Sequence, residues 1–311
     1  MLGECFYWLL NMSILGSLTG LLVLLLGRIR RLPRRWALGL WIIPFLRLCL
    51  PAGPGSSFSL LTPLAGHALR SVPVPVPEAV EEARLLALNC IQLAQTYFPI
   101  TYKDMHVGAF SLEGVFRTAG VLWFIVAAAL LLTMAILYGL TRGELMNAAH
   151  LRENIYTSPK ISSPAVYGIL RPRILLPQGS GDQNLRHVLA HERAHIRHGD
   201  NLWRLLGFSI AALHWFNPLV WLFLRQFLGD MELACDERVL AKLGAEERKS
   251  YALALVDAAE NKNVFISAFG GAKIRTRVGN ILSYKRLSLL STLALLALTL
   301  AIACTLLTNP V

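Results

Sequence analysis

Three stretches of this sequence are apolar over a length that is rare in soluble proteins. They run from Cys5 to Leu26, from Thr118 to Leu140 and from Leu287 to Leu307, and none contains a charged residue. About 20 such residues in a helix span the ~30 Å hydrocarbon core of a bilayer. A fourth stretch, Trp36 to Pro51, is interrupted by a proline and an arginine but is also expected to cross. With 55% hydrophobic and 16% charged residues, the sequence predicts an α-helical multi-pass membrane protein with about four transmembrane helices.

The distribution of basic residues predicts the orientation. Five of the 30 Lys and Arg fall within residues 28–35, and the positive-inside rule places this cluster in the cytoplasm and the N-terminus outside. Residues 1–140 then hold the first three transmembrane segments, with an outer loop at 52–117 between the second and the third. Residues 141–286 form a cytoplasmic domain, and residues 287–311 form the last transmembrane helix and a short tail. The outer loop carries four basic and five acidic residues, whereas the cytoplasmic domain carries twenty basic and thirteen acidic residues. Topology therefore explains the net charge of +11, and no direct binding of nucleic acid is expected.

One short motif in the cytoplasmic domain predicts a metal centre. His191 and His195 are four residues apart, so a helix presents both imidazoles on one face, with Glu192 beside them. In this HExxH pattern both histidines bind zinc and the glutamate is the general base of a peptidase. We therefore predict His191 and His195 as ligands of Zn²⁺ and Glu192 as the catalytic residue. The alternative is an ordinary solvated, charge-rich helix.

A catalytic zinc ion needs a third protein ligand, and the acidic segment Met231–Glu237 is the candidate source. Glu232 is the predicted ligand, and Glu237 is the alternative. Asp236, about one helical turn after Glu232, is expected to accept the free N–H of a ligating histidine, as outer partners of metal sites do. Cys235 is interpreted as a structural thiol.

The segment between the two motifs, residues 202–224, is apolar enough to resemble another span. A single crossing would put His191 and Glu232 on opposite sides of ~30 Å of hydrocarbon, where they could not share an ion. The Asn217-Pro218 pair instead favours a break into two helices, a buried or re-entrant hairpin that leaves the metal site at the inner face of the membrane. Charged residues around the motif disfavour an intramembrane protease, and its glutamate disfavours a catalytically inactive signalling scaffold.

Four segments together resemble the BlaR/MecR regulatory metallopeptidases of Gram-positive bacteria, membrane proteins of the gluzincin type. They are SPAVYGILRPRILLP, HVLAHERAHIRHGD, LHWFNPLVWLFLRQF and MELACDERVLAKLG, in the order of the family. The resemblance implies a mostly α, zincin-like (α+β) metalloprotease domain in a bacterial cell membrane, with zinc on His191, His195 and Glu232 and with Glu192 as the base. It also implies an antirepressor that cleaves a cytoplasmic transcriptional repressor of the BlaI/MecI kind, and a homodimer. The penicillin-binding sensor domain that follows the last helix in the β-lactam sensors is not expected here.

Substrate contacts are expected at two places. An edge strand within residues 165–176 would align an extended peptide by backbone pairing. The residues predicted for this role are Ala165, Val166, Tyr167 and Gly168. His214 is the candidate oxyanion donor, and the alternative is that it packs within the hairpin. Residues 273–286 are basic and precede the last apolar stretch, so they are either a self-cleavage segment or, as we prefer, a positive-inside anchor.

Overall fold

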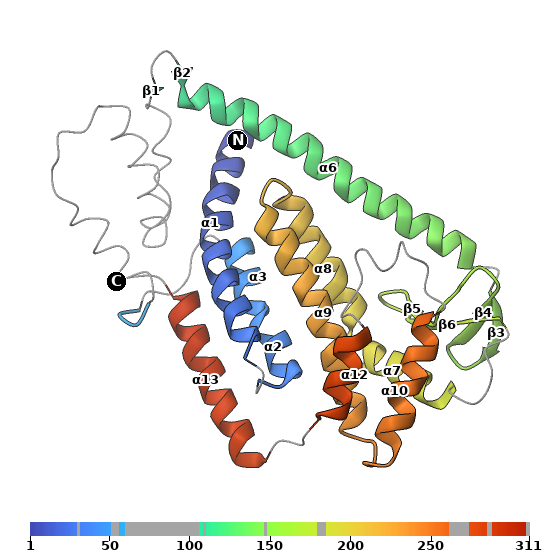
Figure 1. Cartoon of the computed structure of the whole chain (residues 1–311). Coiled ribbons are helices and arrows are strands. Elements are labelled where there is room, and N and C mark those ends of the chain that lie inside the picture. The colour runs from blue at the N-terminus through green and yellow to red at the C-terminus, as the bar shows by residue number, and fades with distance from the viewer. Residues whose placement is uncertain are drawn as a thin grey trace.

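The computed structural model describes residues 1–29, 32–50, 56–59, 106–107, 110–145, 148–178, 185–260, 274–284 and 288–308. Most of the predicted outer loop lies outside these residues, as do Lys273, Lys285 and Arg286 of the predicted basic segment. The described chain is mostly helical with a small sheet (Figure 1). The two-residue strands β1 (His106–Val107) and β2 (Phe110–Ser111) pair just before the long helix α6.

Within the described part, three helices are long and apolar enough to cross a membrane. They are α1 (Leu2–Gly27), α6 (Leu112–Leu145) and α13 (Leu289–Leu307). These helices coincide with the three uninterrupted apolar stretches. The protein is therefore a helical membrane protein, as the sequence predicts.

The fourth predicted span does not form one long helix. It folds as α2 (Arg34–Leu40) and α3 (Ile42–Cys49), which are separated at Trp41. Pro44 lies in the first turn of α3 and has no N–H to donate to the preceding turn, which explains why the helix breaks there. The predicted count of four spans is thus not confirmed.

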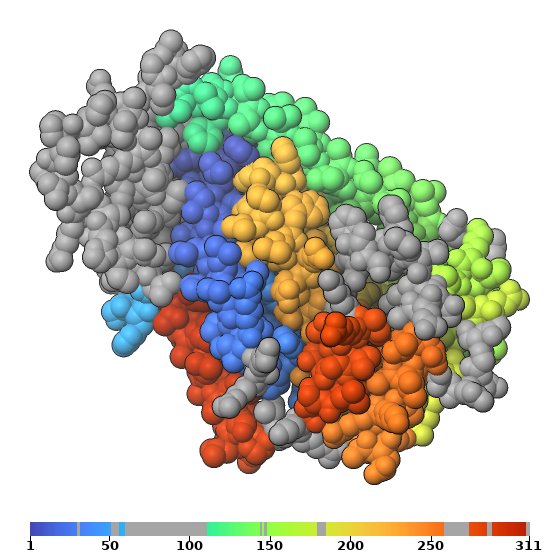
Figure 2. All heavy atoms as spheres, in the orientation of Figure 1, coloured from blue at the N-terminus to red at the C-terminus, as the bar shows by residue number. Residues whose placement is uncertain are grey.

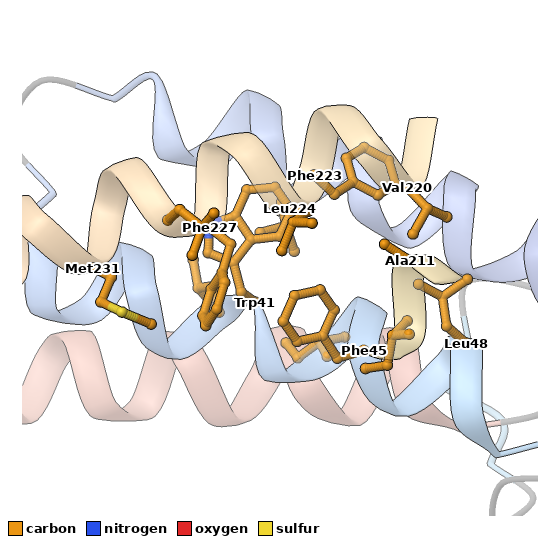
Figure 3. Packing of buried hydrophobic residues seen from close by; sticks show 14 of the residues in the cluster. Trp41, Phe45, Leu48, Ala211, Val220, Phe223, Leu224, Phe227 and Met231 are labelled. Atoms are coloured by element: carbon orange, nitrogen blue, oxygen red, sulfur yellow. The ribbon is translucent and has the colours of Figure 1, made fainter. Parts of the chain in front are cut away.

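The largest hydrophobic core joins α1, α2 and α3 to α9 (Pro218–Leu240) (Figure 3). Phe45 of α3 meets Phe227 of α9 edge to face at 5.0 Å between ring centroids, and the Trp41 ring lies 5.7 Å from that of Phe223. The Trp41 indole also donates to the buried carboxylate of Asp230 at 2.9 Å. These contacts hold α9, whose C-terminal half carries the acidic segment, against the N-terminal helices.

Residues 202–224 form two helices rather than one, as predicted. Helix α8 (Asp200–Leu213) ends before His214, and α9 begins at Pro218, where the Asn217 side chain accepts a hydrogen bond from the N–H of Leu219. Asn217 also donates to two serine hydroxyls of α1, both at 2.7 Å. These serines lie near the middle of α1, so the hairpin tip lies halfway along a helix that can cross a membrane.

The sheet has four strands in the order β3-β4-β6-β5, and β5 is an edge strand. Their bounds are β3 Ala149–Arg152, β4 Ile155–Ser158, β5 Ala165–Tyr167 and β6 Arg173–Pro177. Only β4 and β6 pair in parallel. Buried side chains of β4 and β6 pack on Leu189 of α7 (Leu185–His198). Figure 1 shows the sheet, α7, α10 (Glu247–Glu260) and α12 (Ile274–Leu282) gathered at the end of the α8–α9 hairpin opposite its tip.

Candidate metal centre

Helix α7 brings two imidazoles together, with their rings at right angles to each other. The Nε2 atoms of His191 and His195 lie 3.1 Å apart, and each residue is only 5% exposed. Two nitrogens that bind one tetrahedral zinc ion at 2.0–2.1 Å stand about 3.3 Å from each other. The spacing of the two histidines therefore fits a shared metal ion.

Glu232 of α9 reaches the same point from the other side. One carboxylate oxygen lies 3.5 Å from His191 Nε2 and the other 3.7 Å from His195 Nε2. These distances are close to the edges of a tetrahedral ligand set, about 3.3 Å. Arg204 of α8 donates to the Glu232 carboxylate at 2.7 Å and holds it in this direction. Two imidazoles and a carboxylate are the three protein ligands typical of a catalytic zinc site, in which water takes the fourth position.

A second set of three donors overlaps the first. The ligand atoms of His191, His195 and Cys235 all lie within 4.8 Å of one another, and Cys235 is fully buried. However, the Cys235 thiol donates to the backbone carbonyl of His191 at 3.3 Å. Glu232 is the better third ligand, because its carboxylate faces both Nε2 atoms, whereas the thiol already has a structural partner.

The alternative ligand Glu237 points away from the histidines. Its carboxylate accepts from the backbone N–H groups of Arg34 at 2.8 Å and Arg35 at 3.2 Å, so it caps the start of α2. Each residue turns a helix by about 100°, which carries Glu237 to another face of α9 than Glu232. The structure therefore does not bring Glu237 to the site.

Each histidine is oriented through its other ring nitrogen. His195 Nδ1 lies 2.6 Å from Asp200, the first residue of α8, and His191 Nδ1 lies 3.0 Å from the Tyr251 hydroxyl and 3.2 Å from Asp236. Such outer partners fix the tautomer and direction of a metal-binding imidazole. Asp236 thus lies beside a ring nitrogen of His191 and can accept its N–H.

Asp200 reaches back to His195 because the chain turns sharply between α7 and α8. The turn is at Gly199, which has φ +65° and ψ +32°, a left-handed conformation that glycine adopts at little cost. The prediction did not include Asp200, although its place five residues after the second histidine of the motif is a visible signal. It also did not include Tyr251, for which nothing in the sequence pattern points to the site.

A buried arginine completes the cluster. Arg277 of α12 donates from Nε to one oxygen of Asp236 at 2.8 Å and from Nη2 to the other at 2.7 Å. Its Nη1 lies 3.6 Å from Glu232, and the residue is 6% exposed. From its basic neighbours in the sequence, this arginine is expected to belong to a positive-inside anchor. Only the packing of α12 reveals that its side chain points inward.

The charges of the cluster shift its acid–base equilibria in opposite directions. Burial by itself would raise the pKa of Asp236, but the Arg277 guanidinium outweighs it and lowers that pKa to about 2. Burial acts in the same way on Glu232, and the positive charges of His195 and Arg277 hold its pKa well below the usual range. Conversely, burial would lower the pKa of both histidines, but their anionic neighbours raise it well above the usual value. Glu232 is therefore held in the ionised form that a metal ligand needs.

Glu192 follows His191 on α7 and is 8% exposed. Within the described residues, no hydrogen bond or ion pair ties up its carboxylate. A poorly solvated carboxylate beside two possible ligands can accept a proton from a water molecule in the site.

The edge strand β5 has a polar neighbour. Asn201 of α8 donates from Nδ2 to the carbonyls of Val166 at 3.2 Å and Gly168 at 2.9 Å. The Tyr167 ring stacks on Tyr138 of α6, with centroids 5.1 Å apart. The two side chains that contact β5 here, Asn201 and Tyr138, thus come from helices outside the sheet.

His214 lies far from this centre. It follows the last residue of α8, whereas Asp200, the partner of His195, is the first, and fourteen helical residues extend about 20 Å. His214 is buried, and its Nδ1 lies 3.1 Å from the carbonyl of Ile210 in the preceding turn. The structure does not bring His214 to the histidine pair, which fits the alternative of packing within the hairpin.

Comparison with known proteins identifies the family. The family model described as BlaR1 peptidase M56 matches residues 7–282. The chain belongs to this M56 peptidase family. It is 34% identical over 106 residues to the regulatory protein BlaR1 of Bacillus licheniformis, which is 33% of this chain and 18% of that protein. It is 29% identical over 132 residues to the regulatory protein BlaR1 of Staphylococcus aureus, which covers 39% of this chain and 23% of that protein. It is 28% identical over 98 residues to the methicillin resistance mecR1 protein of Staphylococcus aureus strain Mu50, which covers 30% of this chain and 17% of that protein.

The M56 chain is thus a membrane-associated member of a family of peptidases and signalling proteins, as the resemblance implied. The alignments span less than a quarter of the length of the curated relatives. Its residues fit a metal ion at the point where α7 and α9 meet.

Proposed function

We propose that this M56 chain is a zinc metalloendopeptidase with its active site on the cytoplasmic side of a bacterial membrane. One observation carries the proposal: His191, His195 and Glu232 converge from α7 and α9 on one point, and the residue after His191 is the buried Glu192, whose carboxylate has no hydrogen bond or ion pair among the described residues. A structural site has no need of that additional carboxylate. This argues for a catalyst rather than for an inactive scaffold.

The chemistry follows from the roles of the side chains. His191, His195 and Glu232 would hold the ion, which supplies a Lewis acid and lowers the pKa of water when it is bound. Glu192 accepts the proton of the attacking water and delivers it to the leaving amine. Asp200 and Tyr251 keep the two imidazoles aimed at the ion, so that no binding energy is lost in reorienting them.

An extended protein segment is the proposed substrate. The carbonyls of Val166 and Gly168 accept from one side chain, Asn201, rather than from another strand. Val166 lies in the edge strand β5, so this edge can pair with an incoming peptide once Asn201 gives way.

A cytoplasmic transcriptional repressor is the substrate that agrees with the family. The relatives carry the names of a regulatory protein and of a methicillin resistance protein. The basic cluster at residues 28–35 supports a cytoplasmic active site through the positive-inside rule. Cleavage of a repressor would transmit a signal from the membrane to transcription.

The proposal is tested with the full chain purified in detergent micelles. Zinc content and cleavage of a purified BlaI/MecI-type repressor are compared between the wild type, Glu192→Gln and the exposed control Glu246→Gln. We expect Glu192→Gln to bind zinc like the wild type but to lose cleavage by about 10²-fold or more, whereas Glu246→Gln behaves as wild type. A Glu192→Gln variant that cleaves at the wild-type rate would refute the peptidase mechanism.

A further inference from the structure

Arg277 links the metal centre to a part of the chain that the HExxH motif does not predict. It lies 41 residues after Asp236 and 86 after His191, on a helix that packs against α9 and α10. Figure 2 shows α12 beside α10 at the surface of the molecule. Arg275 is exposed on the same helix, so burial distinguishes Arg277 from the other described basic residue of this segment.

The contact with Asp236 has the geometry of a bidentate pair. Two nitrogens of one guanidinium meet the two oxygens of one carboxylate at 2.8 and 2.7 Å, and both residues are buried. Such a pair sets the plane of the carboxylate as well as its position. The same carboxylate accepts from the Tyr251 hydroxyl at 2.8 Å and lies 3.2 Å from His191 Nδ1. The orientation of His191 therefore depends on a residue of α12.

One further contact of Arg277 shows how the cluster responds to a cation. Its Nη2 lies 3.2 Å from His191 Nε2, the atom that faces His195. A guanidinium has only donors and cannot be a metal ligand, so this contact gives way when an ion binds. The bond from Nε to Asp236 uses a different nitrogen of the guanidinium and does not depend on this contact.

We propose that Arg277 is a positioning residue, which aims Asp236 at His191 and thereby makes the metal site complete only when α12 is docked against α9. This inference rests on the proposed zinc site and deepens it. Because α12 is the last described element before the membrane helix α13, the site is coupled to the segment that enters that helix.

The coupling must be reciprocal. If docking of α12 strengthens metal binding, metal binding must stabilise the docked α12 by the same factor. The prediction therefore has a readout that is independent of catalysis, namely the protection of the amides of α12 when zinc is added.

The experiment compares the full-length wild type with Arg277→Gln, Arg277→Lys and the matched control Arg275→Gln, all purified in detergent micelles. Zinc affinity is measured by competition with a chromophoric chelator, and ligand geometry by the visible spectrum of the cobalt-substituted protein. Hydrogen exchange of peptides covering Ile274–Leu282 is followed with and without zinc.

We expect zinc to slow exchange in α12 of the wild type and of Arg275→Gln. In Arg277→Gln the affinity should fall about tenfold or more, the cobalt spectrum should change and the zinc-dependent protection should disappear. Arg277→Lys keeps the buried charge but not the bidentate geometry, so a partial rescue is expected even if Arg277→Gln folds poorly.

Other outcomes separate the two proposals. If the wild type binds zinc and cleaves its substrate while Arg277→Gln and Arg277→Lys keep its affinity, cobalt spectrum and protection, the role of Arg277 is wrong and the peptidase stands. A wild type that binds no zinc overturns both proposals.

Discussion

Replacing Asp200 by asparagine tests how the outer partners support the metal centre. Asp200 is 1% exposed and lies 2.6 Å from His195 Nδ1, the distance of a charge-assisted hydrogen bond. Asparagine has nearly the same shape, and its carbonyl can still accept from Nδ1–H. The substitution therefore removes the negative charge while it leaves the packing of the α7–α8 turn intact.

The expected loss follows from the strength of this contact. Substitution of an outer partner typically costs 10–100-fold in metal affinity, and each factor of ten is about 1.4 kcal/mol. We therefore expect zinc binding to Asp200→Asn to weaken by about 1.4 to 2.8 kcal/mol. The metal-free protein should also lose stability, since the carboxylate is the buried partner of His195 when no ion is bound. Arg238 Nη1, 3.7 Å from the other oxygen, is too far away for a hydrogen bond and adds little to this loss.

The assay separates binding from folding. Zinc affinity is measured by chelator competition, and thermal unfolding is followed in the presence of excess chelator, for the wild type, Asp200→Asn and the exposed control Glu246→Gln. A variant with zinc affinity within twofold of wild type would refute the assignment of Asp200 as the partner that orients His195. An equal loss of zinc affinity in Glu246→Gln would show that removing any negative charge from the protein weakens zinc binding, whatever its contact with His195.

Three further predictions concern packing and metal linkage. Gly20→Ala should destabilise the protein by about 1 to 3 kcal/mol, because the new Cβ would overlap the Phe223 ring. Gly27→Ala on the same helix is the control, since a Cβ added there would meet no other described atom within 4 Å. Thermal unfolding in detergent compares the two variants. Asn217→Ala should cost about 1 to 2 kcal/mol by the same measurement, since it removes the cap of α9 and two hydrogen bonds to α1. Removal of metal by a chelator should lower the unfolding midpoint of the wild type but not that of Glu232→Ala, and an equal shift in both would count against Glu232 as a ligand.

Local patterns were sufficient for several features of this protein. The uninterrupted apolar stretches became α1, α6 and α13, since a run that is long, apolar and uncharged is compatible with few environments other than a bilayer. The fourth stretch was harder to interpret because its length counts only if the helix is continuous. Pro44 removes a backbone donor within it, and two short helices result.

In the candidate metal centre, too, local sequence patterns predict some features and only the packing of the helices decides others. The helical period alone brings His191 and His195 together, and the Asn217-Pro218 pair alone predicts the break of the hairpin. The sequence also narrows the third ligand to the acidic segment Met231–Glu237 of α9. It cannot decide between Glu232 and Glu237, because that choice depends on which face of α9 packs on α7 and which on α2.

The sequence by itself thus determined the membrane class of the protein, the helix with the histidine pair and the segment that carries the proposed third ligand. Each of these depends on residues that are neighbours along the chain, where spacing translates directly into geometry. Only the tertiary structure decided that Tyr251 and Arg277 join the centre and that His214 stays far from it. Contacts across 60 and 86 residues depend on how several helices pack at once, and no local period encodes that arrangement.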